Sequence, residues 1–163
     1  MDEQQFIQFI KGNQGVIYKV CNIYSETQED FEDLQQEIIY QVWKSISGFI
    51  NKSKLSTWLY RVALDTALNF RRKIKIPTID IETKAFNLID TSSEKQFEEK
   101  TRWLYKAIHQ LNNLERAIIL LYLEEKSYKE ISEISGFPEK QIGMKISRIK
   151  TKLQHILEPI FND

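Results

Sequence analysis

The chain has 163 residues, of which 42% are apolar and 28% charged, with only five glycines and three prolines. This composition is that of an ordered globular protein and excludes disorder over the whole chain. The longest apolar run, from Ala117 to Leu123, is far shorter than the roughly 18 residues that suggest a membrane span, and the first residues lack the pattern of a signal peptide. We therefore expect a cytoplasmic protein without membrane insertion.

The sequence contains no recognisable signature of metal binding or catalysis. Cys21 is the single cysteine, and His109 and His155 are the two histidines, so neither an internal disulfide nor a Cys/His zinc set is expected. The glycines form no dinucleotide-binding or phosphate-binding loop, and neither histidine stands beside a plausible nucleophile. We therefore predict that the chain is not an enzyme and binds neither a metal nor a cofactor.

Acidic and basic residues cancel overall but are unevenly distributed along the chain. Residues 1–37 carry eight acids and two bases, whereas residues 38–76 carry one acid and eight bases. Residues 77–138 carry eleven acids and eight bases, and residues 139–163 carry three acids and five bases. This pattern indicates two basic surfaces for polyanions on an otherwise acidic chain. The alternative is that the charges are unevenly placed by chance. For the second basic segment, residues 139–163, taken alone, this alternative is favoured.

Two amphipathic helices are predicted in the first third of the chain. Apolar residues between Ile17 and Tyr24 follow the spacing i, i+3, i+4, i+7, which places Cys21 in a core-facing stripe. A second helix, over about residues 30–46, repeats apolar residues every four positions. Asp30 and Asp33 suit its N-terminus, where carboxylates meet free N–H groups and the positive end of the helix dipole.

A third helix completes a small bundle and is followed by a break. Its apolar stripe runs from Leu59 to Phe70 and leaves four polar residues toward solvent. These are Arg61, Asp65, Asn69 and Arg72. Pro77 then interrupts the periodicity, and residues 77–97 are predicted to form a linker.

Helical periodicity resumes at about Glu98 and continues across a break near Asn112. Ser127 followed by Glu130 forms a capping box and predicts a new helix start. That helix is expected to end at Gly136.

The last predicted helix opens at Phe137-Pro138, since proline suits the first helical turn, and closes at Pro159. Its buried stripe consists of Ile142, Ile146, Ile149 and Leu153.

A short helix, a glycine turn and a second helix that bears bases form the geometry that places a helix in the DNA major groove. Ser132, four residues before Gly136, is expected to let the two helices cross closely, while Ile142 anchors the second helix on the first. The side chains expected to face DNA are Lys140, Gln141, Lys145, Arg148 and Lys152. Helical hairpins with a basic face also occur in protein-binding domains, and that alternative stays open.

Several stretches, taken in order, resemble one family, the sigma factors of bacterial RNA polymerase. Residues 33–37 (DLQQE), continuing to 42–44 (VWK), resemble the family's DLxQEVFxxxW stretch. Residues 56–63 (STWLYRVA) resemble its TWLYRIA stretch. Residues 107–118 and 127–134 (SYKEISEI) are similar to its A-x-x-x-L-P...R-x-x-x-L and SYxEIAEIxG stretches.

The resemblance covers about residues 6–75 and 100–157, and it is to the minimal, extracytoplasmic-function (ECF) branch. It implies an all-α fold of two small helical domains joined by a linker, the C-terminal one a helix-turn-helix. Residues 1–76 would form a region 2-like domain for core polymerase binding, minus-ten recognition and melting. Residues 77–97 would form the linker, and residues 98–163 a region 4-like domain for minus-thirty-five recognition.

The resemblance also implies which residues serve each contact. The helix that starts near Asp33 matches the one that docks on the clamp coiled coil of the polymerase's largest subunit, although a core position is equally open for Trp43. The core-polymerase candidates are Asp33, Gln36, Glu37 and Trp43.

Residues 49–54 match the loop that captures a flipped base of the minus-ten element, and polar residues on the next helix would follow the strand. The minus-ten candidates are Asn51, Lys52, Ser53, Lys54, Thr57, Arg61, Asn69, Arg72 and Lys73. For Trp58 and Tyr60 both a base contact and a core position are open, and core is favoured.

The last helix matches the family's minus-thirty-five reader with one departure. Where the family commonly has T-V-K-S-R-L, this chain has residues 141–146 (QIGMKI). Gly143 thus replaces a basic residue and costs about 1 kcal/mol of helix propensity relative to alanine. Gly143 either lets the helix backbone approach DNA closely or is a neutral sequence change that the helix tolerates. The neutral change is favoured.

The leading hypothesis is an ECF-type sigma factor that directs core polymerase to promoters and assists their melting. Its implied partners are the bacterial RNA polymerase core, promoter DNA and an anti-sigma factor. The alternatives are a stand-alone helix-turn-helix regulator, which would bind duplex DNA without polymerase, and a protein-only binding module that never melts DNA.

Overall fold

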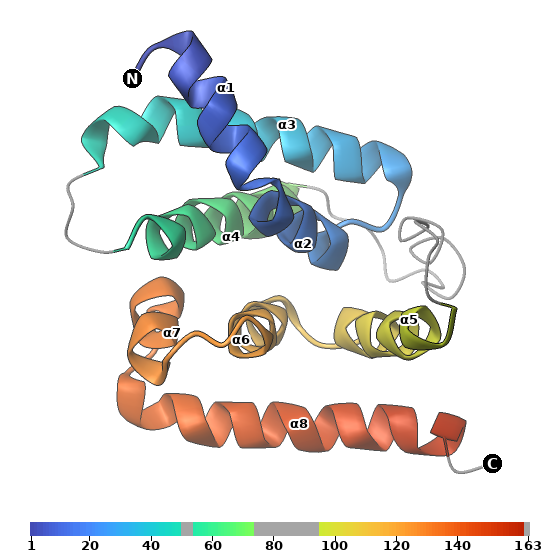
Figure 1. The fold of residues 1–163 in the computed structure, drawn as a ribbon. Helices are drawn as coiled ribbons and strands as arrows, with labels where there is room; N and C mark the ends of the chain where they lie inside the picture. Colours follow the sequence, from blue (N-terminus) through green and yellow to red (C-terminus); the bar gives the residue numbers. More distant parts are fainter. Residues whose placement is uncertain (50–53, 74–94, 162–163) are drawn as a thin grey trace. The chain divides into compact units, whose positions relative to one another are not determined.

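The structure is a computed structural model that describes residues 1–49, 54–73 and 95–161, and the chain divides into two compact units, 1–88 and 89–163 (Figure 1). The described residues form helices and no strand, which confirms the predicted all-α class. Among the described helices, none combines the length and the apolar character that crossing a membrane requires. Three predicted site residues, Asn51, Lys52 and Ser53, lie outside the described residues.

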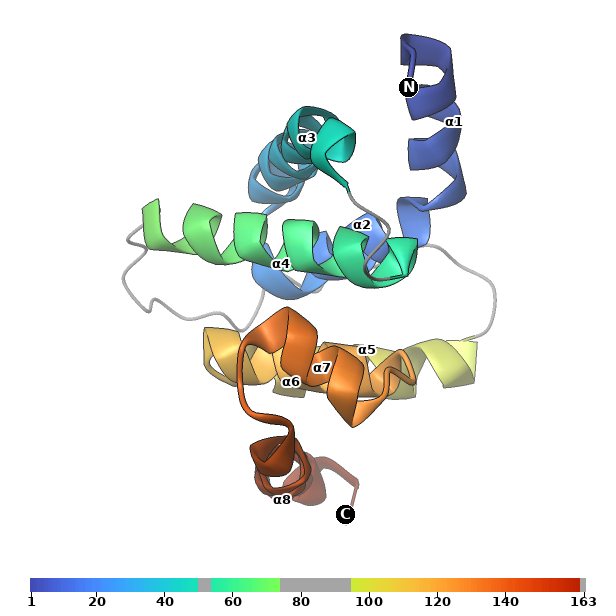
Figure 2. The same ribbon diagram turned by 90° about the vertical axis from the view of Figure 1, so that its left-hand side faces the viewer.

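The first unit is a small helical bundle whose core matches the predicted stripes. Its elements are α1 (Glu3–Gly12), α2 (Gln14–Tyr24), α3 (Gln28–Ser45), the 3-10 helix η1 (Ile46–Gly48) and α4 (Leu55–Lys73). Helices α2, α3 and α4 pack against one another, and Figures 1 and 2 show α3 lying across the other two. Cys21, Ile38 and Leu59 are fully buried between them, so burial of these apolar stripes holds the unit together.

Helix α1 is absent from the sequence prediction. It begins with a capping box, in which the Asp2 carboxylate accepts from the Gln5 N–H at 2.8 Å and the Gln5 side chain accepts from the Asp2 N–H at 2.9 Å. Its one buried residue, Phe6, packs edge-to-face on Trp43 of α3, with ring centroids 4.7 Å apart. This contact attaches α1 to the end of α3.

Helix α3 begins earlier than predicted because its cap is a threonine. The Thr27 hydroxyl accepts from the Asp30 N–H at 3.0 Å, so the first helical residue is Gln28 rather than residue 30 or 31. Asp30 lies in the first turn, where its charge still meets the positive end of the helix. Asp30 therefore lies where its charge can interact with the helix dipole, as expected, but the capping residue is Thr27 and not Asp30.

The second unit contains the predicted helix-turn-helix. Its helices are α5 (Lys95–His109), α6 (Asn113–Leu123), α7 (Tyr128–Ser135) and α8 (Glu139–Phe161). Helix α5 starts at Lys95, so the last three residues of the predicted linker 77–97 belong to a helix. Helix α8 continues past Pro159, contrary to the prediction, because a proline in the last turn removes only one terminal hydrogen bond.

The break between α5 and α6 is closed by a buried arginine. The Arg116 guanidinium donates from Nε to the Leu111 carbonyl at 3.0 Å and from Nη2 to the His109 carbonyl. Asn112 caps α6, with its side chain accepting from the Glu115 N–H at 2.8 Å. The His109 carbonyl that ends α5 and the Glu115 N–H in the first turn of α6 therefore have partners inside the unit.

Candidate functional site

The turn of the helix-turn-helix is fixed by a glycine and a serine. Gly136 ends α7 in the left-handed region, with φ of 83°, which favours glycine. The Ser132 hydroxyl donates to the Phe137 carbonyl at 2.6 Å, while the Ser132 carbonyl accepts from the Gly136 N–H at 2.9 Å. Ser132 therefore holds the turn by hydrogen bonding, beyond the small size that the sequence suggested.

The serine half of the predicted capping box is present at the start of α7, while the Glu130 carboxylate accepts from the Ser127 hydroxyl and not from its backbone N–H. The Ser127 hydroxyl accepts from the Glu130 N–H at 3.1 Å and donates to the Glu130 carboxylate at 3.2 Å. The buried residues Ile131 and Ile134 face the unit's core, together with Ile142 of α8. These contacts fix the direction in which α8 leaves the turn.

Helix α8 presents a polar face opposite its buried stripe. The stripe is Ile142, Ile146, Ile149 and Leu153, as predicted. The exposed candidates are Lys140, Gln141, Arg148 and Lys152. Lys145 is only half-exposed, because its ammonium lies 4.1 Å from the centre of the Phe137 ring.

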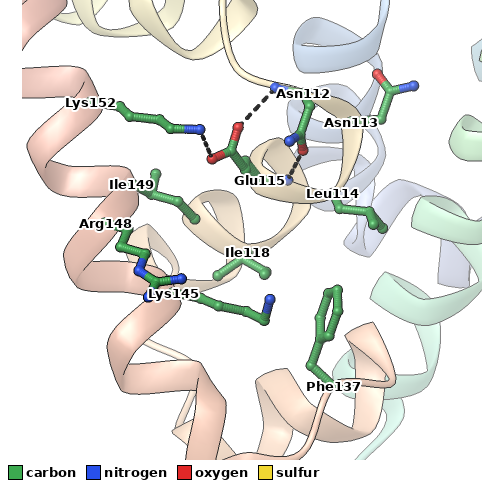
Figure 3. A pocket seen from close by; sticks show the side chains of 10 residues that line it. All are labelled: Asn112, Asn113, Leu114, Glu115, Ile118, Phe137, Lys145, Arg148, Ile149 and Lys152. Carbon is green, nitrogen blue, oxygen red and sulfur yellow. Dashed lines mark hydrogen bonds and ion pairs between the residues drawn. The ribbon is translucent and has the colours of Figure 1, made fainter.

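A groove of about 490 Å³ lies between α6 and α8 (Figure 3). Three of the five minus-thirty-five candidates, Lys145, Arg148 and Lys152, line it. Lys152 points across the groove and pairs with the Glu115 carboxylate at 2.6 Å. The ammonium that was predicted to meet DNA is thus held by the carboxylate that also caps α6.

Gly143 has a packing partner that the sequence did not reveal. A Cβ atom at this position would lie 3.2 Å from Cε2 of Tyr128 on α7, which is closer than ordinary contact between carbon atoms. The glycine therefore leaves room for the Tyr128 ring on α8. Residue spacing could not reveal this contact, because the two residues belong to different helices.

The exposed face of α4 carries most of its predicted polar residues. Lys54, just before the helix, and Arg61, Asn69 and Arg72 on it are exposed. Thr57 is the exception at 4% exposure, so the expectation that it lies on the open face is wrong. Lys73 is the last residue of α4.

The two undecided aromatic residues of α4 differ in burial. Tyr60 is 2% exposed and belongs to the core. Trp58 is half-buried and packs on Phe49, with ring centroids 5.2 Å apart. Phe49 and Trp58 lie on either side of residues 50–53 in the chain, so their contact joins the two stretches that flank those residues.

A polar groove between α3 and α4 brings together residues that the sequence assigned to different contacts. Asp33, Gln36 and Glu37 of α3 line it together with Asp65 and Asn69 of α4. Partial burial of the Asp65 carboxyl raises its pKa, and the nearby Arg61 guanidinium offsets part of that rise. Asn69, a minus-ten candidate, therefore shares a groove with three core-polymerase candidates.

Trp43, the fourth core-polymerase candidate, lies outside this groove. Its side chain is 44% exposed and its ring packs on Phe6. It lines a separate pocket with Met1, Phe49 and Leu55. Neither a fully buried core position nor a free surface position describes it.

The chain matches two family descriptions, Sigma-70 region 2 over residues 9–75 and Sigma-70 region 4 over residues 101–153. It is 29% identical over 147 residues to the ECF RNA polymerase sigma-E factor of Haemophilus influenzae, a match that covers 82% of this chain and 78% of that relative. It is 31% identical over 121 residues to the RNA polymerase sigma factor SigV of Bacillus subtilis, covering 73% of this chain and 70% of that relative.

The fold is also similar to a solved structure, that of the sigma factor RpoE from Bartonella quintana in complex with the anti-sigma factor NepR. The TM-score is 0.71 at 20% sequence identity, over 95% of this chain and 98% of that chain. Because region 2 matches the first unit and region 4 the second, a stand-alone helix-turn-helix regulator is not favoured. The chain belongs to the ECF group of the sigma-70 family, RNA polymerase sigma factors that act in transcription initiation rather than as catalysts.

Proposed function

We propose that the two units of this sigma factor have different functions. Residues 1–76 bind core polymerase and open the minus-ten element, residues 95–163 read the minus-thirty-five element, and residues 77–94 link them. The observation that carries the proposal is that each unit presents a basic helical face, on α4 and on α8, opposite a fully buried stripe. Polymerisation chemistry then belongs to the core enzyme.

The polymerase contact is assigned to α3. Asp33, Gln36 and Glu37 line one polar groove, and an exposed aromatic ring such as Trp43 is a frequent anchor at protein interfaces. Carboxylates on the same helix as an exposed aromatic ring suit a basic, amphipathic partner helix.

The minus-ten contact is assigned to α4 and the loop before it. Lys54, Arg61 and Arg72 recur at seven- and eleven-residue intervals on one exposed face, where they can follow a single-stranded phosphate backbone. Asn51, Lys52 and Ser53 complete this assignment from the sequence, with Asn69 and Lys73 farther along α4. The buried Thr57 is left out, because it supports the packing of α4.

The minus-thirty-five contact is assigned to the first half of α8. Lys140, Gln141 and Arg148 are exposed there, and Lys145 stands beside them on the Phe137 ring. Arginine and lysine reach phosphates and guanine edges, and glutamine pairs with adenine. Lys152 contributes mainly through its ion pair with Glu115.

We further propose a cytoplasmic location, where bacterial core polymerase and promoters are found, and control by an anti-sigma factor. Two solved structures of similar fold are complexes, one of the sigma factor RpoE with the anti-sigma factor NepR and one of CnrH with the cytosolic domain of CnrY. A signal that releases such a partner would switch this chain on.

The direct test is run-off transcription with purified bacterial core polymerase on fragments of the source genome. New discrete transcripts in the presence of the chain are expected and would also define the promoters. Co-elution with core polymerase without transcripts would favour a protein-only binding module, and binding of duplex DNA without polymerase would favour a stand-alone regulator.

Reversing the charge at Lys52 and Lys54 tests whether promoter melting can be lost while binding to core polymerase is kept. Lys52→Glu with Lys54→Glu should abolish open-complex formation, measured by permanganate reactivity of unpaired thymines, and should leave co-elution with core polymerase intact. The matched control is Lys11→Glu with Lys100→Glu, which makes the same charge change at exposed positions of α1 and α5. Unchanged melting in the first variant would contradict the assignment.

A further inference from the structure

An ion pair ties α3 to α4 where α3 begins and α4 ends. The Arg71 guanidinium donates from Nη2 to the Glu26 carboxylate at 2.7 Å, and the two residues lie 45 positions apart in the chain. Their side chains are only 13% and 16% exposed. Within the described part of the chain, Nη1 of the same guanidinium is buried without a hydrogen-bond partner. The Glu26 carboxylate is therefore what compensates the burial of the Arg71 charge.

Both members of the pair stand at points that set the position of a helix. Glu26 directly precedes Thr27, whose hydroxyl caps α3 by accepting from the Asp30 N–H at 3.0 Å. Arg71 lies in the last turn of α4, two residues before the helix ends at Lys73. The ion pair therefore holds the start of α3 against the last turn of α4.

A second contact joins the opposite ends of the same two helices. Phe49 follows α3 and η1 and packs on Trp58 in the first turn of α4, with ring centroids 5.2 Å apart. Helices α3 and α4 run in roughly opposite directions (Figures 1 and 2). Along both helices, the residues that line the polar groove lie between these two contacts. They include the core-polymerase candidates Asp33, Gln36 and Glu37.

We propose that Glu26 and Arg71 form a positioning pair for polymerase docking, because their ion pair keeps the walls of the polar groove at the spacing that the partner helix requires. The inference rests on the proposed function, since it requires α3 to be the surface on which core polymerase docks. Neither member of the pair contacts polymerase. Both act through the groove residues of α3, of which Asp33 is the nearest to Glu26 in the chain.

An ion pair can fix this spacing because its geometry is directional. A carboxylate and a guanidinium at 2.7 Å form a short, charge-assisted hydrogen bond, and partial burial protects the pair from screening by salt. Burial of the apolar stripes is non-directional, so it holds the helices together without fixing how far their ends are apart. Loss of one partner leaves the other charge buried and uncompensated, and the start of α3 then has to move to let water reach that charge.

The test measures the affinity of the full chain for purified core polymerase. Glu26→Gln removes the charge and keeps the size of the side chain, and we expect affinity to fall about three- to tenfold, the scale of ordering one or two side chains at an interface. Glu29→Gln removes the same charge from an exposed position in the first turn of α3 and is the matched control, which should bind as wild type.

A charge swap tests whether the pair itself carries the effect. Arg71→Glu places two carboxylates together and should weaken binding more than Glu26→Gln does. Adding Glu26→Arg restores opposite charges at the same place and should recover most of the affinity.

A double-mutant cycle separates positioning from a loss of stability. Glu37→Gln removes one proposed contact with polymerase directly. If Glu26 acts through the groove, Glu26→Gln combined with Glu37→Gln should lose less affinity than the product of the two single losses, because the displaced groove already lacks the Glu37 contact. Val20→Ala damages the fully buried core of α2 and leaves the ion pair intact. Verified as folded by circular dichroism, this variant should bind as wild type.

Wild-type affinity of both Glu26→Gln and Arg71→Glu would overturn the proposal. Independent losses in the double-mutant cycle would also overturn it, since the pair would then act apart from the groove. A loss in Val20→Ala as large as that in Glu26→Gln would reduce the pair to a contribution to stability. If the wild-type chain does not bind core polymerase at all, the proposed function fails, whereas the other outcomes leave it standing.

Discussion

The two units differ in which partners hold the basic residues of α4 and of α8. On α4, Arg61 and Arg72 recur on one exposed face through helical spacing, and Arg71 pairs with the Glu26 carboxylate at 2.7 Å. On α8, tertiary partners from other elements of the same unit also hold the ammonium groups in place. These pairs are Lys145 on Phe137 at 4.1 Å, Lys150 to the Tyr122 hydroxyl at 2.6 Å and Lys152 to Glu115 at 2.6 Å.

The difference has a consequence for how each unit meets nucleic acid. Side chains that are already ordered lose less conformational entropy on binding, which favours Lys145 of α8 in the proposed contact with a rigid duplex. On α4 itself, Trp58 forms a half-buried pair of rings with Phe49. A face of that kind suits unstacked bases and a strand whose shape changes during melting.

The largest expected effect concerns the reactivity of Cys21, which is the chain's one cysteine and is fully buried in the first unit. Burial raises the pKa of its thiol from 9.0 to about 12. At pH 8 the thiolate fraction should therefore be about a thousandfold lower in the folded chain than in denaturant. Alkylation followed by mass spectrometry measures this protection.

The raised pKa of Cys21 also makes the free energy of unfolding depend on pH. Between pH 9 and 12 the unfolded chain loses the thiol proton while the folded unit keeps it, so the free energy of unfolding of the first unit should fall as the pH rises through this range. A Cys21→Ala variant should lack that component of the pH dependence. Equal alkylation rates for the folded and the denatured chain would contradict the burial on which both expectations rest.

A smaller effect should appear when the core of the second unit alone is damaged. Ile131 of α7 is fully buried, and Ile131→Ala should lower the unit's free energy of unfolding by about 2–5 kcal/mol. Hydrogen exchange should then show faster exchange in α5 to α8, while Cys21 stays protected from alkylation. If Cys21 became reactive in this variant, the two units would not unfold independently.

Helical periodicity predicted the buried stripes because it depends only on neighbours along one helix. It placed Cys21, Ile38 and Ile142 in the core, and all three are fully buried. It did not predict α1, whose one buried residue, Phe6, packs on α3. Without α1, the environment of Trp43 could not be decided from the sequence.

Contacts between helices account for most of what the sequence could not supply. The ring of Tyr128 on Gly143 and the ammonium of Lys145 on Phe137 join residues whose spacing in the chain carries no periodic signal. Thr57 was misplaced for a related reason, because a polar side chain near a helix start can be covered by neighbouring elements while the rest of its face stays open. Sequence reasoning thus found the faces but not the partners of individual side chains.

The smallest expected effect concerns the pair that most clearly separates α8 from α4. Lys152 is 56% exposed in its ion pair with Glu115, and such exposed pairs contribute about 0–1 kcal/mol. Lys152→Ala should therefore lower the free energy of unfolding by less than about 1 kcal/mol. It should also reduce promoter affinity less than Arg148→Ala, because Arg148 belongs to the face assigned to DNA.

The Glu115→Gln variant tests whether Lys152 serves the ion pair with Glu115 or contacts DNA. Glutamine can take the place of glutamate in a capping box, so the start of α6 should stay intact while the charge that holds Lys152 is removed. If the pair keeps Lys152 away from DNA, promoter affinity of Glu115→Gln should match or exceed that of wild type. If Lys152 instead contacts a phosphate directly, Lys152→Ala should lower the salt dependence of binding by about one unit of slope, and the contrast between the two helices would then disappear at this position.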